Sequence, residues 1–278
     1  MKKKKIKRIS LAGVAALGLL ILSACSKPGV TSSSNGLWNQ IVFWFAQIIH
    51  WLSFGGSIGL GIILITIIIR AALMPLMSLQ IKSSQKTQEL QPQIKALQAK
   101  FPGKDMESRR LLQDATQKLY AENKVNPYAG CLPVLVQLPF LWALYQALIN
   151  VDFVRIWNVP TNFFWLDLTV KDPTYVLPIL AALFTFLSSY LMMKSAPERN
   201  SMTLSMTIIM PIFILIMALN FSAGVALYWV VSNAFQVFQT MLIANPWKII
   251  AARDAKTQAV LDKEKSRERA FRKATKKK

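Results

Sequence analysis

One apolar stretch, residues 57–79, most limits the folds that this chain can adopt. It is 23 residues long and carries a single charge, Arg70. At about 1.5 Å per residue such a helix spans a bilayer core of about 30 Å. An arginine near a helix end can reach the headgroups. However, nine residues follow Arg70, which places it roughly 13 Å from that end. Helical side chains also lean toward the N-terminus, so Arg70 leans away from that end. An arginine inside a span usually marks a functional site, so the remaining question is what keeps Arg70 hydrated.

The composition indicates a polytopic membrane protein that binds no metal or cofactor. The chain is 53% hydrophobic, yet its formal charge is +20, a combination typical of apolar spans with basic connectors. Two cysteines and one histidine cannot form a disulfide framework or a typical zinc site. Nucleotide-binding and hydrolase motifs are absent from the sequence. We therefore expect no cofactor, no metal and no enzymatic activity.

The first 24 residues have the basic start, apolar core and small residues of a secretory signal. The sequence Leu22-Ser23-Ala24-Cys25 resembles a bacterial lipobox, which predicts cleavage after Ala24 and lipidation of Cys25 on the outer face. An ordinary signal or an uncleaved anchor is the alternative. Residues 25–36 then form a short polar linker.

Residues 37–56 are apolar but place four polar side chains within about 100° of one another at helical spacing. These are Asn39, Gln40, Gln47 and His50. This pattern, with its tryptophans, predicts a helix lying in the outer interface of the membrane. His50 is interpreted as an interfacial polar residue.

Residues 80–128 are predicted to form a helical hairpin. The stretch from 80 to 126 has nine basic and five acidic residues, and its two helical patterns flank a break at Phe101-Pro102-Gly103. Asp105 is placed to cap the second helix. Ile94, Leu97 and Phe101 form a narrow apolar stripe. The stripe either holds the hairpin together or makes it a mobile flap over a membrane site.

Four further apolar segments, 129–150, 174–193, 203–220 and 224–243, complete an all-α protein with five transmembrane helices. The connector 151–173 has a net charge of −1, whereas the tail 244–278 has a net charge of +8. The positive-inside rule places the hairpin and the tail in the cytoplasm, and Cys25 and the 151–173 loop outside.

None of the five predicted spans contains an aspartate or glutamate. Arg70 therefore has no carboxylate partner in the membrane, and an unpaired arginine in hydrocarbon is strongly disfavoured. We expect it to lie in a water-holding groove lined by neutral polar groups. Candidates at helical spacing are Thr66, Gln137, Thr185, Ser188, Trp229, Asn233 and Gln236. Taken alone, a polar residue of this kind more often forms a hydrogen bond between helices than lines a functional groove.

Several motifs resemble those of the YidC-type membrane insertases, the family that includes the Oxa and Alb proteins of organelles. They are Leu90-Gln91-Pro92, Asn126-Pro127 with Gly130-Cys131-Leu132-Pro133, Gln137-Leu138-Pro139, and the stretch 224–233 (GVALYWVVSN). The resemblance implies a groove around Arg70 that is open to the cytoplasm and the lipid, with Thr66 and Trp229 at client-contacting positions. Some members have an aromatic hydroxyl where this chain has Trp229.

The expected function is therefore insertion of membrane proteins, alone or with the Sec channel, without nucleotide hydrolysis. The implied partners are nascent membrane proteins, membrane lipids and, through the basic tail, the ribosome; DNA is not among them. A lipid scramblase would also use a polar groove open to the bilayer. A secondary transporter is disfavoured because the spans lack acidic residues for a proton relay and show no repeated halves.

Overall fold

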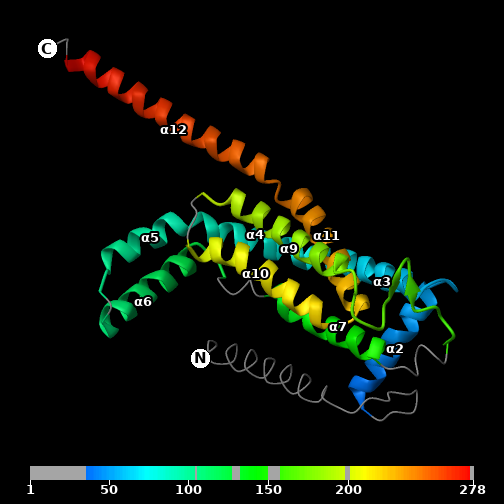
Figure 1. Ribbon diagram of the computed structural model, residues 1–278. Helices are drawn as coiled ribbons and strands as arrows, with labels where there is room; N and C mark the ends of the chain where they lie inside the picture. Colours follow the sequence, from blue (N-terminus) through cyan, green and yellow to red (C-terminus); the bar gives the residue numbers. More distant parts are fainter. Residues whose placement is uncertain (1–35, 104, 127–131, 150–156, 198–200, 276–278) are drawn as a thin grey trace.

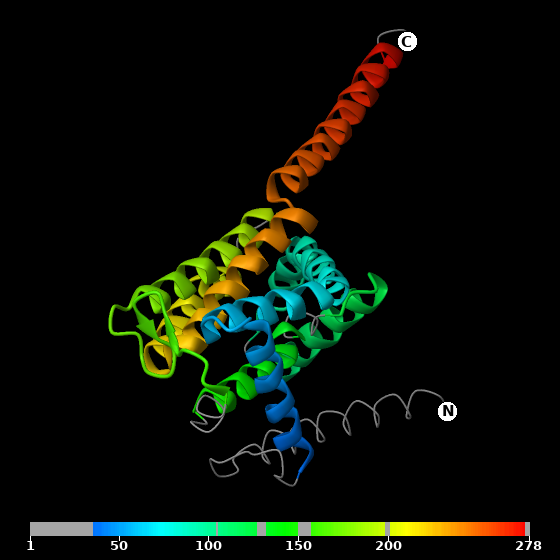
Figure 2. The same cartoon turned by 90° about the vertical axis from the view of Figure 1, so that its right-hand side faces the viewer.

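The computed structural model describes residues 36–103, 105–126, 132–149, 157–197 and 201–275, which are mostly helical. The predicted signal and Cys25 lie outside the described residues. The first described helix, α2 (Leu37–Leu52), runs across the ends of α3 (Ile58–Ala72) and α7 (Leu132–Ile149) and packs against both (Figure 2). Its buried face includes Val42 and Ile49, while Trp44 and Trp51 are exposed on the opposite side.

The stretch 57–79 is divided into two helices. After α3 the chain bends by 62° into α4 (Met74–Glu89). Pro75 lies in the first turn of α4, where it has no N–H to continue the hydrogen-bond ladder of α3. The nine residues after Arg70 therefore advance about 9 Å along the α3 axis, instead of the roughly 13 Å expected of a straight helix. Arg70 lies in the last turn of α3.

Helices α5 (Gln91–Lys100) and α6 (Met106–Glu122) lie side by side, away from the other helices (Figure 1). Leu90, Ile94 and Val125 form a small buried cluster between them. Asp105 caps α6 by accepting a hydrogen bond of 2.8 Å from the Ser108 N–H. Ile94, from the predicted stripe, thus holds the two helices together.

The remaining helices form a bundle of α7, α9 (Val176–Ser195), α10 (Ser201–Asn220) and α11 (Ala223–Ile243) with α3. Among the described residues, α9 and α11 are each long and apolar enough to cross a membrane, and the bent pair α3–α4 counts as a third span if taken together. The described apolar parts of α7 and α10 are shorter.

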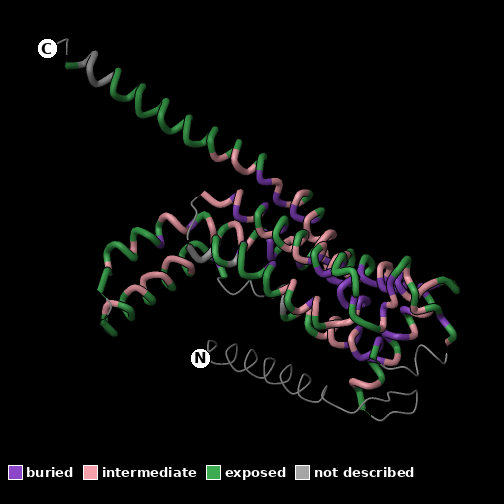
Figure 3. The backbone as a smooth tube through the Cα atoms, in the orientation of Figure 1, coloured by how far each residue is buried: buried purple, intermediate pink, exposed green. Residues whose placement is uncertain are grey.

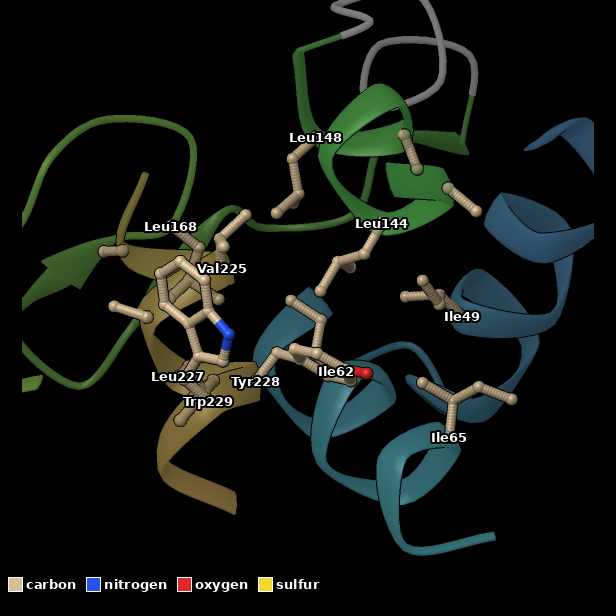
Figure 4. Packing of buried hydrophobic residues seen from close by; sticks show 14 of the residues in the cluster. Ile49, Ile62, Ile65, Leu144, Leu148, Leu168, Val225, Leu227, Tyr228 and Trp229 are labelled. Carbon is tan, nitrogen blue, oxygen red and sulfur yellow. The ribbon is translucent and has the colours of Figure 1, made fainter. Parts of the chain in front are cut away.

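The buried core lies at the end of the bundle where α2, α3, α7 and α11 meet (Figure 3). In Figure 4, Ile49, Ile62, Leu144 and Val225 converge from these four helices. The core also receives Leu168 from the loop that contains the two-stranded antiparallel sheet of β1 (Asn162–Phe163) and β2 (Leu166–Asp167).

Helix α12 (Pro246–Thr275) projects from the other end of the bundle and is largely exposed (Figures 1 and 3). Its start is attached to the end of α9. The Lys194 ammonium lies 4.8 Å from the centre of the Trp247 ring, and Arg253 donates to the Ser195 carbonyl at 3.4 Å.

We predict that Gly61→Ala destabilises the protein, because a Cβ at Gly61 would lie 2.2 Å from the Ile49 carbonyl oxygen of α2. Backbone cannot move aside as a flexible side chain can, so overpacking of about 1–3 kcal/mol is expected. Thermal unfolding in detergent measures this loss. Leu60→Ala, on an exposed face of α3, is the control, and an equal melting temperature for Gly61→Ala and the wild type would contradict the packing.

Asp172 is predicted to stabilise the start of α9. Its carboxylate accepts hydrogen bonds from the Thr174 N–H (2.8 Å), the Thr174 hydroxyl (2.6 Å) and the Leu177 N–H (2.8 Å). Partial burial raises the pKa of Asp172, but these hydrogen bonds outweigh it and hold the pKa below the ordinary value of 3.8. Asp172→Ala should therefore cost about 1–2 kcal/mol at neutral pH.

The acid dependence follows from the lowered pKa. The stabilisation is present above the unfolded-state pKa and is lost as the pH falls through the folded-state pKa. The melting-temperature difference between wild type and Asp172→Ala should thus shrink when measured below about pH 4. Asp114→Ala, at an exposed position of α6, is the control. A difference that persists unchanged at low pH would contradict a role for the ionised carboxylate.

Candidate functional site

The candidate site is built around Arg70, whose side chain is held by neutral groups from two other helices. Its Nε donates to the Ser232 hydroxyl of α11 at 3.3 Å, and its Nη2 donates to Gln137 Oε1 of α7 at 3.4 Å. Gln137 Nε2 in turn donates to the Tyr228 hydroxyl of α11. The network thereby joins α3, α7 and α11, and Arg70 is only 8% exposed.

Within the part of the chain that the structure describes, no acid neutralises the charge of Arg70. Among the described residues its polar partners are Ser232 and Gln137, and it makes no ion pair there. A guanidinium has five N–H donors, and two of its nitrogens are used in these bonds. The network therefore orients the guanidinium while leaving positive charge and donor capacity available to water or to a ligand.

Arg70 lines a pocket that is partly open to its surroundings. Its empty space, including the open side, is about 360 Å³. The polar lining is Thr66, Arg70, Gln137, Tyr228 and Ser232, and the apolar lining is Ile69, Leu73, Met77, Val136 and Phe140. Thr66 itself donates to the Ile62 carbonyl of its own helix at 2.6 Å. The structure thus brings together three of the predicted residues: Arg70, Thr66 and Gln137.

The other predicted residues do not line this pocket. Asn233 donates to the Thr185 hydroxyl at 2.7 Å, so these two side chains join α11 to α9. Trp229 is buried in the core, with its ring 5.7 Å from that of Phe221. Ser188 is buried on α9, and Gln236 is half-buried on α11.

Two lining residues, Tyr228 and Ser232, are absent from the set predicted from the sequence. They are four residues apart, as are Trp229 and Asn233, but the two pairs are turned by about 100° on the helix. Figure 4 shows the Tyr228 ring extending from α11 toward α3, while Trp229 lies to the other side. Tyr228, the residue before Trp229, therefore brings an aromatic hydroxyl to the pocket. The i, i+4 spacing of Tyr228 and Ser232 was the sequence feature from which they could have been predicted as neighbours on one face of the helix.

A second pocket lies at the α2 end of the bundle and is mostly apolar, lined by residues that include Ala46, Ile58 and Leu148. His50 stacks on Trp157 there, with ring centres 5.0 Å apart and planes 12° apart. Over the described ranges there is no group of three or more His, Cys, Asp or Glu side chains that could hold a metal ion.

Comparison with known proteins identifies relatives along almost the whole chain. The family model described as 60Kd inner membrane protein matches residues 50–250. "Membrane protein insertase YidC 1" of Lactococcus lactis subsp. lactis (strain IL1403) is 67% identical over 275 residues, which cover 99% of this chain and 100% of that one. "Membrane protein insertase YidC" of Enterococcus faecalis (strain ATCC 700802 / V583) is 50% identical, covering 96% of each chain.

A solved structure is also similar. "Active YidC insertase crystal structure with the first transmembrane domain resolved" matches with a TM-score of 0.59 and 26% sequence identity. The match covers 74% of this chain but 47% of that longer chain.

We predict that the pocket beside Arg70 is hydrated in the membrane. In that case Gln137→Cys should react with a water-soluble maleimide, because thiol reactivity requires the thiolate and hence water. Leu138→Cys, the next residue, lies at an exposed apolar position, so it should face lipid and react at least tenfold more slowly. The rate of labelling in sealed vesicles is the measurement, and equal slow rates at both positions would contradict a wet pocket.

Proposed function

This chain belongs to the 60Kd inner membrane protein family, together with the YidC membrane protein insertases, and from that premise we propose how its residues carry out insertion. The protein is a membrane protein that inserts other membrane proteins. This family is not a classical enzyme family, so its activity has to be explained by binding and by the solvent environment of the groove.

We propose five spans with the C-terminus in the cytoplasm. In this arrangement α3, α7, α9, α10 and α11 cross the membrane, and α2 lies in the outer interface with a lipidated Cys25 beside it. The helix pair α5–α6 and the basic helix α12 are then cytoplasmic. The net charges of the connectors support this orientation through the positive-inside rule.

In the proposed mechanism, the protein lowers the free-energy barrier that a short polar segment of a client, a membrane protein being inserted, must cross. Moving unpaired polar groups through hydrocarbon costs several kcal/mol. A wet groove that enters from the cytoplasmic side shortens the dry part of that path. The client's apolar helix then moves sideways into the lipid, where burial of its side chains is favourable.

The observation that carries this proposal is the un-neutralised guanidinium of Arg70 in an open pocket. Gln137 and Ser232 fix its position through neutral hydrogen bonds, so its charge remains available to acidic residues of the client. At about 5 Å and an effective dielectric constant of about 20, the attraction is about 3 kcal/mol before screening. Even half of that value changes a rate about tenfold.

Two partners belong to the same proposal. The net charge of the tail 244–278 is +8, which suits ribosomal RNA, and such contacts weaken steeply with salt. The Sec channel is the other expected partner, because clients with long translocated segments need a continuous aqueous path.

We predict that Arg70→Ala reduces insertion of clients with acidic translocated segments about tenfold, and of neutral clients much less. The reason is the lost attraction between the guanidinium and the crossing carboxylates. Insertion of matched acidic and neutral clients in cells depleted of the wild-type protein measures the difference. Arg70→Lys keeps the charge and should retain most of the activity toward acidic clients. Equal insertion of both clients by Arg70→Ala would contradict the attraction.

A further inference from the structure

Two exposed aromatic residues lie in turns whose backbone does not favour them. Phe164, between β1 and β2, has a φ of 54°, and Tyr175, the residue before α9, has a φ of 59°. Glycine and asparagine adopt this left-handed conformation far more readily than bulky residues do. Phe164 is nevertheless 83% exposed and Tyr175 57% exposed. Neither backbone preference nor packing among the described residues therefore explains why aromatic residues occupy these turns.

Trp165 joins the two turns into one surface. Its indole Nε1 donates to the hydroxyl of Thr174, the residue before Tyr175, at 3.2 Å. The ring centres of Phe164 and Trp165 are 6.0 Å apart, and Trp165 remains 61% exposed. We call Phe164, Trp165 and Tyr175 the aromatic rim.

The segment that carries the rim is fixed to the bundle on its other side. Phe163 packs on α3, where a Cβ at Gly59 would lie 2.4 Å from its ring. Leu166 is 4% exposed and belongs to the core. The Ala223 N–H of α11 donates to the Val170 carbonyl at 2.6 Å. The aromatic rim is therefore held in place at the end of the bundle where α2 also lies (Figure 1).

The position of the rim indicates what covers it. Tyr175 directly precedes α9, which is long and apolar enough to cross a membrane. The end of such a helix lies near the headgroups, where tryptophan and tyrosine are enriched because their rings are apolar and their edges polar. Residues 157–166 carry no charge, and Asp172 is turned inward and bonded to Thr174. Lys171 is exposed, and a lysine suits the phosphate level.

We propose that the aromatic rim binds the lipid interface at the α2 end of the bundle, with its rings between the headgroups and the acyl chains. Transfer of the rings out of water then offsets the unfavourable backbone of the two turns. In the orientation proposed above this interface belongs to the outer leaflet, so the loop rests on the membrane. The binding itself does not depend on which leaflet it is, nor on insertase activity.

Spin labels in lipid bilayers test the depth of the rim. Phe164→Cys and Tyr175→Cys provide the labelling sites after Cys131→Ser, and Cys131→Ser alone gives the background. Ile179→Cys, at a position of α9 that is 57% exposed, is the lipid reference, and Ala259→Cys, on the exposed face of α12, is the water reference. The ratio of collisions with oxygen, which concentrates in lipid, to collisions with a water-soluble nickel chelate should exceed the water reference at least about threefold at both sites.

The other outcomes would overturn the proposal. A ratio equal to that of Ala259→Cys at either site would place that part of the rim in water. A label that neither reagent reaches would indicate a covering protein, such as a second copy of the chain. Because insertion is not measured, either result would leave the proposed function intact.

The native tryptophan gives an independent measurement. The chain has eight tryptophans, and subtracting the emission of Trp165→Phe from that of the wild type isolates Trp165. Lipids with bromine near the headgroup should quench this emission at least about twofold more than lipids with bromine near the chain ends. Quenching by aqueous iodide alone would place Trp165 in water, and quenching by neither agent would indicate a protein cover. Both results would contradict binding to the lipid interface.

Discussion

The arrangement depends on a positive charge that is positioned but not neutralised. An ion pair would hold Arg70 more firmly, yet it would cancel the charge and fill the donor sites of the guanidinium. Hydrogen bonds to Ser232 and Gln137 instead restrain the side chain through neutral acceptors. Because a bare arginine in hydrocarbon is costly, we propose that water enters the pocket from one side of the bundle.

At the other end of the bundle, two pairs of backbone segments pack closely. Gly61 lets α3 approach the Ile49 carbonyl of α2, and Gly224 donates its N–H to the Leu168 carbonyl at 2.9 Å, so the loop is bonded directly to the start of α11. Apolar side chains such as Ile62 and Leu144 fill the space between. The polar pocket lies on the far side of these apolar side chains, at the bend after α3. One end is therefore mostly apolar, and the other carries the polar groups of the Arg70 pocket.

The sequence alone was sufficient to predict the features that depend on which residue types the spans contain. The lack of acids in the predicted spans singled out Arg70, and spacing or motif placed Thr66 and Gln137 beside it. The sequence was insufficient to predict which neighbour each face of α11 contacts. This helix carries polar groups on two faces, and only the packing shows that Tyr228 and Ser232 meet Arg70 while Asn233 meets Thr185. The apolar run through Pro75 also read as one straight span, because hydropathy does not report a lost hydrogen bond or the 62° bend that accompanies it. The insertase motifs, by contrast, identified the family correctly.

The central claim is that the Arg70 guanidinium is hydrated within the membrane protein. Water-edited solid-state NMR of the protein in lipid bilayers, with labelled arginine and an Arg70→Lys sample to assign the signal, measures this directly. The account predicts that magnetisation from water reaches the Arg70 side-chain nitrogens nearly as fast as it reaches the exposed arginines of α12. Transfer from lipid acyl chains without transfer from water, or coupling to a carboxylate carbon, would contradict it.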